Sequence, residues 1–335
     1  MRNSEPPLVT VGIPVFNGEN GLARALDSIL QQRHKNLEVI ISDNGSTDAT
    51  QKISLAYASK FSQIRYFRSE TNNGAIWNFN RVFELSSGKY FMWAAHDDHR
   101  DSEFVSKCVA KLEDREDAVL CQVGTAIFIE DHEAPMCIVA PSELSGGIRG
   151  LVGRYERTLR HCPATAIYGL FRAQAMRRTR LFEPIIATDR AFIPELSIYG
   201  EIIFTPDVLL SYYGRKTWNT VDEDYRSYFG DTRKTKPWWY LPFLILFVNH
   251  WKRIASADVS SISKCRLWLV ITKNELRQAV VKVIFKIARL LCPTKLKQKL
   301  GEMMYWRFLY EPYLKVVEKD LFVERQIKPC LGWWR

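Results

Sequence analysis

The chain of 335 residues is long enough to bury the core of one large domain or two of ordinary size. Its 47% hydrophobic and 25% charged residues are ordinary for a globular protein and argue against disordered, collagen-like and disulfide-scaffold classes. The net charge of +10 is uneven: residues 215–335 carry 24 Lys+Arg against 11 Asp+Glu, which indicates an acidic partner for that part alone.

Apolar strands alternate with helical patterns over the first third of the chain. We expect strands at 8–15, 37–42, 64–67 and 90–95, and helices at 22–30, 49–61 and 75–85. This alternation with short turns favours an α/β fold, in which helices cover a parallel sheet. Ligands bind at the carboxyl ends of the strands in such sheets. Polar residues fall at those ends here: Asn17, Asp43 and Asp97-Asp98.

The middle of the chain is less regular. Strand-like runs occupy 118–129, 165–171 and 202–210, and a helix is compatible with 190–198. From Trp238 onward the pattern changes to long helices that are rich in Trp, Phe, Lys and Arg.

The adjacent acids Asp97 and Asp98 follow an apolar strand, where two carboxylates are costly unless a cation or another partner compensates them. Oxygen ligands suit Mg²⁺ or Mn²⁺, which keep several waters and bridge to substrate phosphates. The alternative interpretation is a solvated turn in which Asp98 caps a following helix. A carboxylate such as Asp43, at the end of the second strand, can bind a base or a ribose hydroxyl, whereas Asp48 is typical of a helix N-cap.

Other enzyme classes lack their motifs. The chain has no GxxxxGK[ST] loop, no GxGxxG after a strand and no GxSxG or HExxH motif. The seven scattered cysteines have no CxxC spacing, and residues 1–7 contain no apolar segment typical of a signal peptide. We therefore expect reduced thiols and a cytoplasmic protein.

A series of short motifs runs in order over residues 6–216. They are Pro14-Val15-Phe16-Asn17, Asp43-Asn44-Gly45-Ser46-Thr47-Asp48, Asn73-Gly74 with Asn80, Gly88-Lys89-Tyr90 leading to Asp97-Asp98, Tyr168-Gly169-Leu170-Phe171-Arg172, Thr188-Asp189, Tyr199-Gly200 and Tyr212-Tyr213-Gly214-Arg215. Each motif is weak alone, but the ordered set resembles family 2 glycosyltransferases of the GT-A fold. The resemblance implies a catalytic domain over 1–216, with a nucleotide-binding half at about 6–100 and an acceptor half at about 101–216, followed by a basic helical region at 217–335.

The resemblance also implies roles for individual residues. Asp43 would bind the nucleotide base, commonly uracil, with Phe16 stacking on it. Asp97 and Asp98 would hold the Mn²⁺ or Mg²⁺ ion that binds the donor diphosphate, and Asp189 would be the general base. The residues implied to bind the donor are Phe16, Asn17, Glu19, Asp43, Asn73, Asn80, Asp97 and Arg215.

The sequence departs from the family pattern at two positions. Ala95 stands where an acid is common, and Thr188 stands where the family has Glu before the catalytic Asp. A single base without a protein nucleophile predicts inversion at the anomeric carbon, through an oxocarbenium-like transition state.

The C-terminal region contains two apolar runs with basic neighbours. Residues 238–248 are apolar and aromatic, and over 278–291 Lys282, Lys286 and Arg289 share one face of an otherwise apolar helix. Such patterns fit helices that lie on an anionic membrane, although buried helices packed on the catalytic domain are the alternative. No nucleic-acid-binding motif is present, so nucleic acid is not an expected partner.

Together these features predict a metal-dependent, inverting glycosyltransferase. It would move a sugar from a nucleotide-diphosphate donor, which we expect to be a UDP-sugar, to a glycan or lipid-linked acceptor in cell-surface polysaccharide or glycolipid synthesis. We expect it to be peripheral on the cytoplasmic face of the inner membrane. The rival hypotheses are a non-catalytic, membrane-associated carbohydrate-binding or scaffold protein on a transferase fold, and a nucleotidyltransferase.

Overall fold

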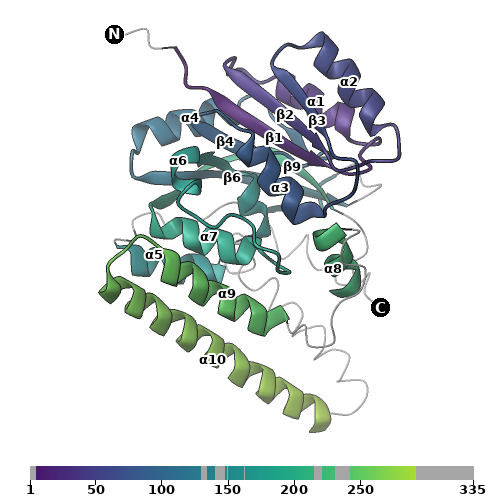
Figure 1. The fold of residues 1–335 in the computed structure, drawn as a ribbon. Coiled ribbons are helices and arrows are strands. Elements are labelled where there is room, and N and C mark those ends of the chain that lie inside the picture. Colours follow the sequence, from purple (N-terminus) through teal and green to yellow (C-terminus); the bar gives the residue numbers. More distant parts are fainter. Residues whose placement is uncertain are drawn as a thin grey trace.

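The first four strands of the chain lie side by side and parallel. The computed structural model describes residues 5–129, 134–139, 148, 150–161, 163–214, 221–230 and 242–291. Within them β1 (Val9–Val15), β2 (Leu37–Asp43), β3 (Ile64–Arg68) and β4 (Tyr90–Trp93) take the order β3-β2-β1-β4 (Figure 1). All seven residues of β1 are buried because both faces of a central parallel strand are covered.

The sheet continues beyond β4 with mixed strand directions. β8 (Leu170–Arg172) is antiparallel to β4 and to β6 (Ala118–Ile129), which in turn runs parallel to β9 (Glu201–Gly214). The short strands β5 (His99–Arg100) and β7 (Cys137–Val139) pair antiparallel with β9 and β6. The described residues thus form one nine-stranded sheet that joins the two halves expected from the sequence.

Helices cover both faces of this sheet. On one face pack α1 (Leu22–Leu30), α2 (Thr50–Lys60) and α4 (Phe104–Asp114). On the other face pack α3 (Ala75–Glu84), α6 (Ala173–Met176) and α7 (Asp189–Ile198). Helices on both faces of the sheet are the arrangement that the alternating pattern predicts. The predicted α/β, GT-A-type fold is confirmed.

Trp93 lies in the hydrophobic core between the sheet and the helices α3, α6 and α7. Its buried indole packs against the rings of Phe171, Phe182 and Phe192 at centroid separations of 4.9–5.5 Å. Its Nε1–H donates to the carbonyl oxygen of Phe79 at 2.8 Å. Because Trp93 ends β4, these contacts fix the point from which the chain enters the Asp97-Asp98 turn.

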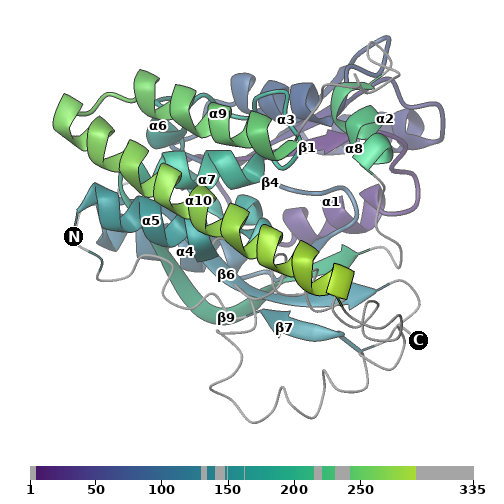
Figure 2. The same ribbon diagram turned by 90° about the horizontal axis from the view of Figure 1, so that it is seen from below.

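The C-terminal helices pack on the catalytic unit in layers. α5 (Leu151–His161) and α9 (Pro242–Ser256) contact α7, and the 31-residue α10 (Ser261–Leu291) contacts α5 and α9 from outside (Figure 2). The short α8 (Val221–Phe229) returns to α3 in the nucleotide-binding half. Among the described residues, no helix is long and apolar enough to cross a membrane.

Three local expectations were wrong. Residues 165–171 are not one strand: the 3-10 helix η1 (Ala164–Tyr168) precedes the short β8. Asp98 does not cap a helix, because β5 follows it and α4 begins only at Phe104. The N-cap of α2 is Ala49, one residue after Asp48, although the Asp48 carboxylate still accepts the N–H of Thr50 at 3.0 Å.

Candidate functional site

The carboxyl ends of the parallel strands form one polar edge. Register pairs Val15 with Asp43, and Asp43 with Arg68, so the residues that follow β1, β2 and β3 are neighbours. Phe16, directly after β1, is 41% exposed. Its ring is therefore accessible at the place where the resemblance implies stacking on a base.

Asn17 and Glu19 connect the β1–α1 loop to the β2–α2 loop. Asn17 has a left-handed backbone (φ 52°), and its Oδ1 accepts the N–H of Thr47 at 2.9 Å. The Glu19 carboxylate accepts the N–H of Ala49 at 2.9 Å, while Asp48 accepts the N–H of Glu19 at 3.0 Å. Both side chains thus hold the pocket loops together, a supporting role that the donor-binding expectation did not include.

Asp43 is completely buried, and its carboxylate is occupied by protein donors. Oδ1 accepts the N–H of Ser46 at 2.8 Å, and Oδ2 accepts both the Tyr66 hydroxyl at 2.8 Å and the Arg68 guanidinium. Burial raises the pKa of Tyr66 to about 12, so this phenol stays a donor to Asp43 at neutral pH. Arg68 covers Asp43 on the solvent side, since about a third of its side chain is exposed.

The two asparagines expected in the donor set lie in structural linkages. Asn73 donates through Nδ2 to Ser69 Oγ at 2.7 Å and to the Thr71 carbonyl at 3.0 Å. Asn80 donates to the Phe182 carbonyl at 2.8 Å and accepts the Phe182 N–H at 3.1 Å. Asn80 therefore ties α3 to the segment that leads to Asp189. Arg215 lies outside the described residues.

Asp97 and Asp98 lie in the turn between β4 and β5, and they differ in exposure. Asp97 is partly exposed, whereas Asp98 is completely buried. One carboxylate oxygen of Asp98 accepts the N–H of Tyr213 at 3.1 Å, and the other oxygen is buried without a hydrogen-bond partner. Such an atom costs free energy unless a ligand satisfies it.

The charge balance around Asp98 is also incomplete. Burial raises the pKa of Asp98 to about 7; the positive charge of Arg100 opposes this shift and the neighbouring Asp97 adds to it. The Arg100 guanidinium is itself buried, and it donates through Nη2 to the Trp93 carbonyl at 2.9 Å. Its Nε and Nη1 have no partner. The site therefore contains a buried carboxylate and a buried guanidinium, each with unused hydrogen-bonding capacity.

These residues fit a divalent cation that is shared with a substrate. The unpartnered oxygen of Asp98 and the accessible carboxylate of Asp97 are hard ligands. Among the described residues no third acid, His or Cys joins them in a group that could hold a metal. Two protein carboxylates suffice for Mg²⁺ or Mn²⁺ where waters and phosphate oxygens supply the remaining ligands.

Arg24 and Tyr213 belong to this site and were not predicted from the sequence. The Arg24 guanidinium donates to the Asp97 carbonyl at 2.5 Å and lies over the Tyr213 ring, 4.2 Å from its centroid. Tyr213 in turn donates its backbone N–H to Asp98. Arg24 comes from α1 and Tyr213 from the end of β9, so only the three-dimensional fold brings them to the acids. The close approach of Gly21 to Asp97, where an added Cβ would lie 2.8 Å from the Asp97 Cα, completes this packing.

Asp189 is the first residue of α7. Burial raises its pKa, while the charge of Arg190 and backbone N–H groups oppose the shift. A carboxylate with a raised pKa is better matched to proton abstraction near neutral pH. α7 packs against η1, whose last residue Tyr168 lies near the charges of Asp97 and Asp98.

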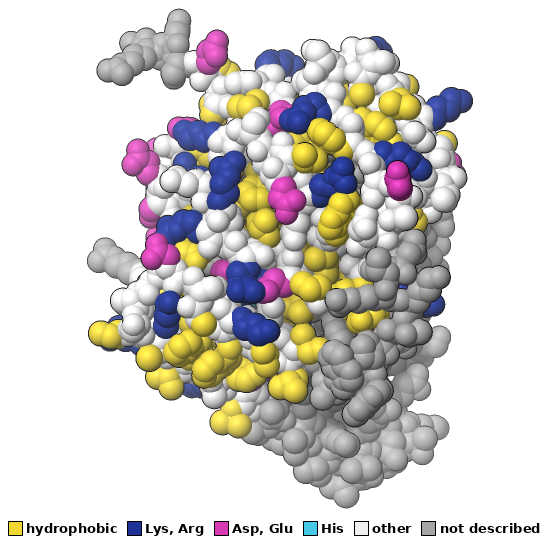
Figure 3. All heavy atoms as spheres, viewed as in Figure 1, with side chains coloured by type: hydrophobic (Ala, Val, Ile, Leu, Met, Phe, Trp, Pro, Cys, Tyr) yellow, Lys and Arg dark blue, Asp and Glu magenta, His cyan; other side chains and the backbone are white. Residues whose placement is uncertain are grey.

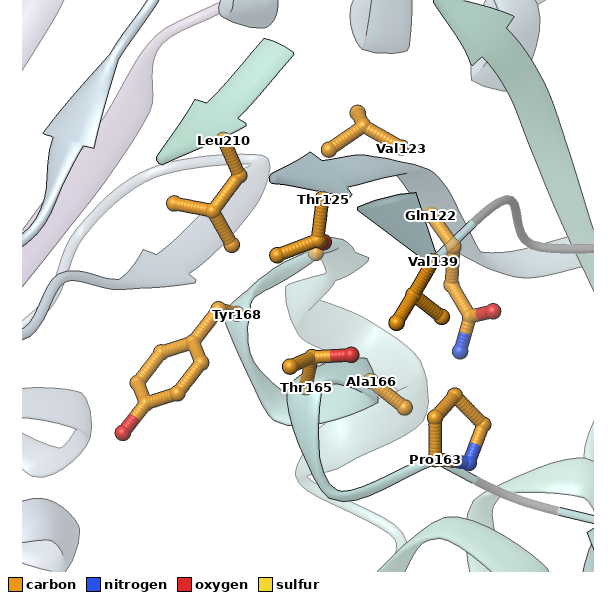
Figure 4. A pocket seen from close by; sticks show the side chains of 10 residues that line it. Gln122, Val123, Thr125, Val139, Pro163, Thr165, Ala166, Tyr168 and Leu210 are labelled. Atoms are coloured by element: carbon orange, nitrogen blue, oxygen red, sulfur yellow. The ribbon is translucent and has the colours of Figure 1, made fainter. Parts of the chain in front are cut away.

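A small, partly open cavity lies beside η1 and is too small for a sugar. It has a volume of about 10 Å³ and lies between β6 and η1 (Figure 4). That volume corresponds to about one water molecule. In Figure 4 the phenol of Tyr168 points away from the other lining side chains.

Comparisons with known proteins agree with this geometry. The model of the family described as Glycosyl transferase family 2 matches residues 10–185, just over half of the chain. An uncharacterized glycosyltransferase of Rickettsia prowazekii is 37% identical over 140 residues, which are 41% of this chain and 42% of that protein. The chain spans less than half of the length of the Rickettsia relatives that it matches.

Two solved structures share the fold. TarS 1–349 of Staphylococcus aureus, in complex with UDP-GlcNAc, is 17% identical with a TM-score of 0.55, covering 78% of this chain and 70% of that one. The mannosyltransferase PcManGT of Pyrobaculum calidifontis, in complex with GDP-Man and Mn²⁺, is 15% identical with a TM-score of 0.52, covering 92% and 82%. From the match of the family model, this chain belongs to glycosyl transferase family 2.

Proposed function

We propose that this protein transfers a sugar from a nucleotide-diphosphate donor, preferentially a UDP-sugar, to an acceptor hydroxyl. The carrying observation is the buried, unpartnered oxygen of Asp98 beside the accessible Asp97, at the edge where the parallel strands end. Structural neighbours are complexes with UDP-GlcNAc and with GDP-Man and Mn²⁺, which supports a nucleotide-sugar donor and a divalent cation.

The donor would lie along the strand-end edge. Phe16 offers an exposed ring for the base. The partly exposed Arg68 guanidinium, which is bonded to Asp43, provides a positive charge at the same edge. A base that reaches Asp43 must displace or share Arg68, because the Asp43 carboxylate is already occupied. Asp97 and Asp98 would hold the cation, whose positive charge would stabilise the departing diphosphate.

The acceptor would be activated by Asp189. Its raised pKa and its place in the acceptor half suit a base that takes the proton of the attacking hydroxyl. Direct attack without a protein nucleophile inverts the anomeric configuration. A glycan or lipid-linked acceptor in surface polysaccharide or glycolipid synthesis, at the cytoplasmic face of the inner membrane, fits the strongly basic C-terminal region.

Donor hydrolysis tests the enzyme against the scaffold alternative. Purified protein is incubated with UDP-sugars and Mn²⁺ or Mg²⁺, and release of UDP is measured. We expect metal-dependent release that Asp97→Asn lowers by about 100-fold or more. A protein that binds UDP-sugars but releases no UDP, with or without the substitution, supports the non-catalytic scaffold.

The role of Asp189 is tested separately. Asp189→Asn removes the base but keeps the size of the side chain, so we expect transfer to fall by about 10²–10⁴-fold while UDP-sugar affinity is retained. NMR of the product anomer reports inversion or retention. Full transfer by Asp189→Asn, or a product with the configuration of the donor, contradicts this assignment.

A further inference from the structure

α10 forms the outermost layer on its side of the molecule (Figure 2). Its inner face packs through Leu267 and Ile271, both completely buried, against α5 and α9. α9 is held more firmly, because Arg253 and Ile254 are also completely buried. Packing therefore accounts for the inner faces of both helices and leaves the outer face of α10 to be explained.

Three large aliphatic side chains are strongly exposed on that outer face. Ile262, Leu269 and Leu276 are 68%, 70% and 66% exposed, and they follow one another at intervals of seven residues. Two turns of helix separate each from the next, so they form one stripe along α10. On α9, Leu244, Val248 and Trp251 are exposed as well. Figure 3 shows hydrophobic side chains gathered, with Lys and Arg among them, where Figure 1 places these helices.

The exposed charged side chains in residues 261–277 of α10 are all positive. Arg266, Lys273 and Arg277 are exposed between the aliphatic residues. Glu275, the one acid in residues 261–277, is only partly exposed. The outer face (Ile262, Arg266, Leu269, Lys273, Leu276 and Arg277) is thus both apolar and basic. A purely apolar partner would leave the basic residues without ionic contacts, and a purely acidic partner would leave the aliphatic residues exposed to water.

We propose that this outer face of α10 lies on the surface of an anionic phospholipid membrane. The aliphatic stripe would enter the boundary between headgroups and acyl chains, and the basic residues would contact lipid phosphates, as in interfacial helices. The Trp251 and Trp268 rings stack at 5.0 Å where α9 meets α10, and Trp251 is partly exposed, so an amphipathic aromatic group adjoins the face. The proposed lipid-linked acceptor gives this contact a purpose, but binding itself does not require transfer.

Vesicle co-sedimentation of the full chain tests the proposal. We expect binding to vesicles of phosphatidylcholine mixed with phosphatidylglycerol, and little binding to phosphatidylcholine alone. Arg266→Gln/Lys273→Gln/Arg277→Gln should weaken partitioning by about 100-fold, because each basic residue near an anionic surface lowers the dissociation constant about fivefold. Ile262→Ser/Leu269→Ser/Leu276→Ser should weaken it at least as much, and both variants should keep their melting temperature.

The matched control removes three exposed lysines from other helices, Lys52→Gln/Lys60→Gln/Lys111→Gln, and should keep binding within a few-fold. No binding of the wild type to anionic vesicles at physiological salt overturns the proposal, as does an equal loss in the control. A wild-type dimer that the serine variant converts to a monomer, without vesicle binding, shows instead that α10 binds a second copy. UDP release measured without lipid tests the transferase proposal alone, so the two proposals can fail independently.

Discussion

The two buried arginines Arg253 and Arg100 differ in how many of their guanidinium nitrogens have hydrogen-bond partners. Arg253 of α9 donates through Nε to Asn249 at 2.6 Å, through Nη1 to Glu195 and through Nη2 to the Leu181 carbonyl at 2.8 Å. Arg100, beside the Asp97-Asp98 turn, has a partner for Nη2 only.

The difference separates a structural linkage from a ligand site. A buried charge with matched partners holds helices in one arrangement, here α9 against the segment before α7. Buried polar atoms without partners cost stability and persist where a ligand or the chemistry uses them. The Arg253–Glu195 pair therefore stabilises the fold, whereas the unpartnered atoms of Asp98 and Arg100 support the proposed ligand site.

The largest expected effect breaks the structural pair. Arg253→Met leaves Glu195 buried without its cation, so the free energy of unfolding should fall by about 3–5 kcal/mol. Urea denaturation followed by circular dichroism measures it. Lys252→Met, at the neighbouring exposed position, is the control and should stay within about 0.5 kcal/mol of the wild type. A loss below about 1 kcal/mol for Arg253→Met contradicts the assignment.

Asp98→Asn tests the proposed ligand site at the Asp97-Asp98 turn. The amide keeps the acceptor for Tyr213 but removes the carboxylate charge, so UDP release should fall by about 10²–10³-fold, equivalent to about 3–4 kcal/mol in the barrier. Mn²⁺ should also no longer raise the melting temperature. Asp101→Asn changes an exposed acid that directly follows β5 and should leave both readouts near wild type. Retention of most activity by Asp98→Asn would place the functional charge elsewhere.

His250 gives a pH-dependent test of the α5–α9 contact. Burial and the charge of Arg253 lower its pKa to about 3, and the Tyr155 hydroxyl lies 2.8 Å from its Nδ1. The unfolded chain binds this proton below about pH 6.5 and the folded chain does not, so stability is lost as pH falls from 6.5 towards 3. The loss should be about 1.4 kcal/mol per pH unit. Denaturation between pH 7 and 5 should show a shallower slope in His250→Phe; equal slopes contradict this assignment.

Arg24→Ala carries the smallest expected effect. It removes the hydrogen bond to Asp97 and the contact with Tyr213, so kcat/KM for the donor should fall about fivefold, or about 1 kcal/mol. Arg33→Ala removes an exposed arginine that pairs with Glu103 and is the control. Equal effects of the two substitutions would show that Arg24 does not position the acids.

The structure shows a different role for several residues from the one expected from the sequence. Asn17, Glu19 and Asn80 were expected at the donor, and their side chains are engaged with the backbone of neighbouring loops. Their types could be read from the chain, but an amide or carboxylate serves equally well for a ligand or for a loop. Only the positions of the surrounding N–H and C=O groups distinguish the two.

The alternating strands and helices could be predicted from the amino-acid sequence, because hydrophobic periodicity and turn residues are local features. The sequence also showed that polar residues follow the parallel strands. Which of those polar residues have hydrogen-bond partners within the protein depends on the tertiary structure. Arg24, Arg100 and Tyr213 come from three separate elements, and the unpaired oxygen of Asp98 depends on where all of them lie. The Asp97-Asp98 pair was therefore visible in the chain, while its burial and its missing partner required the fold.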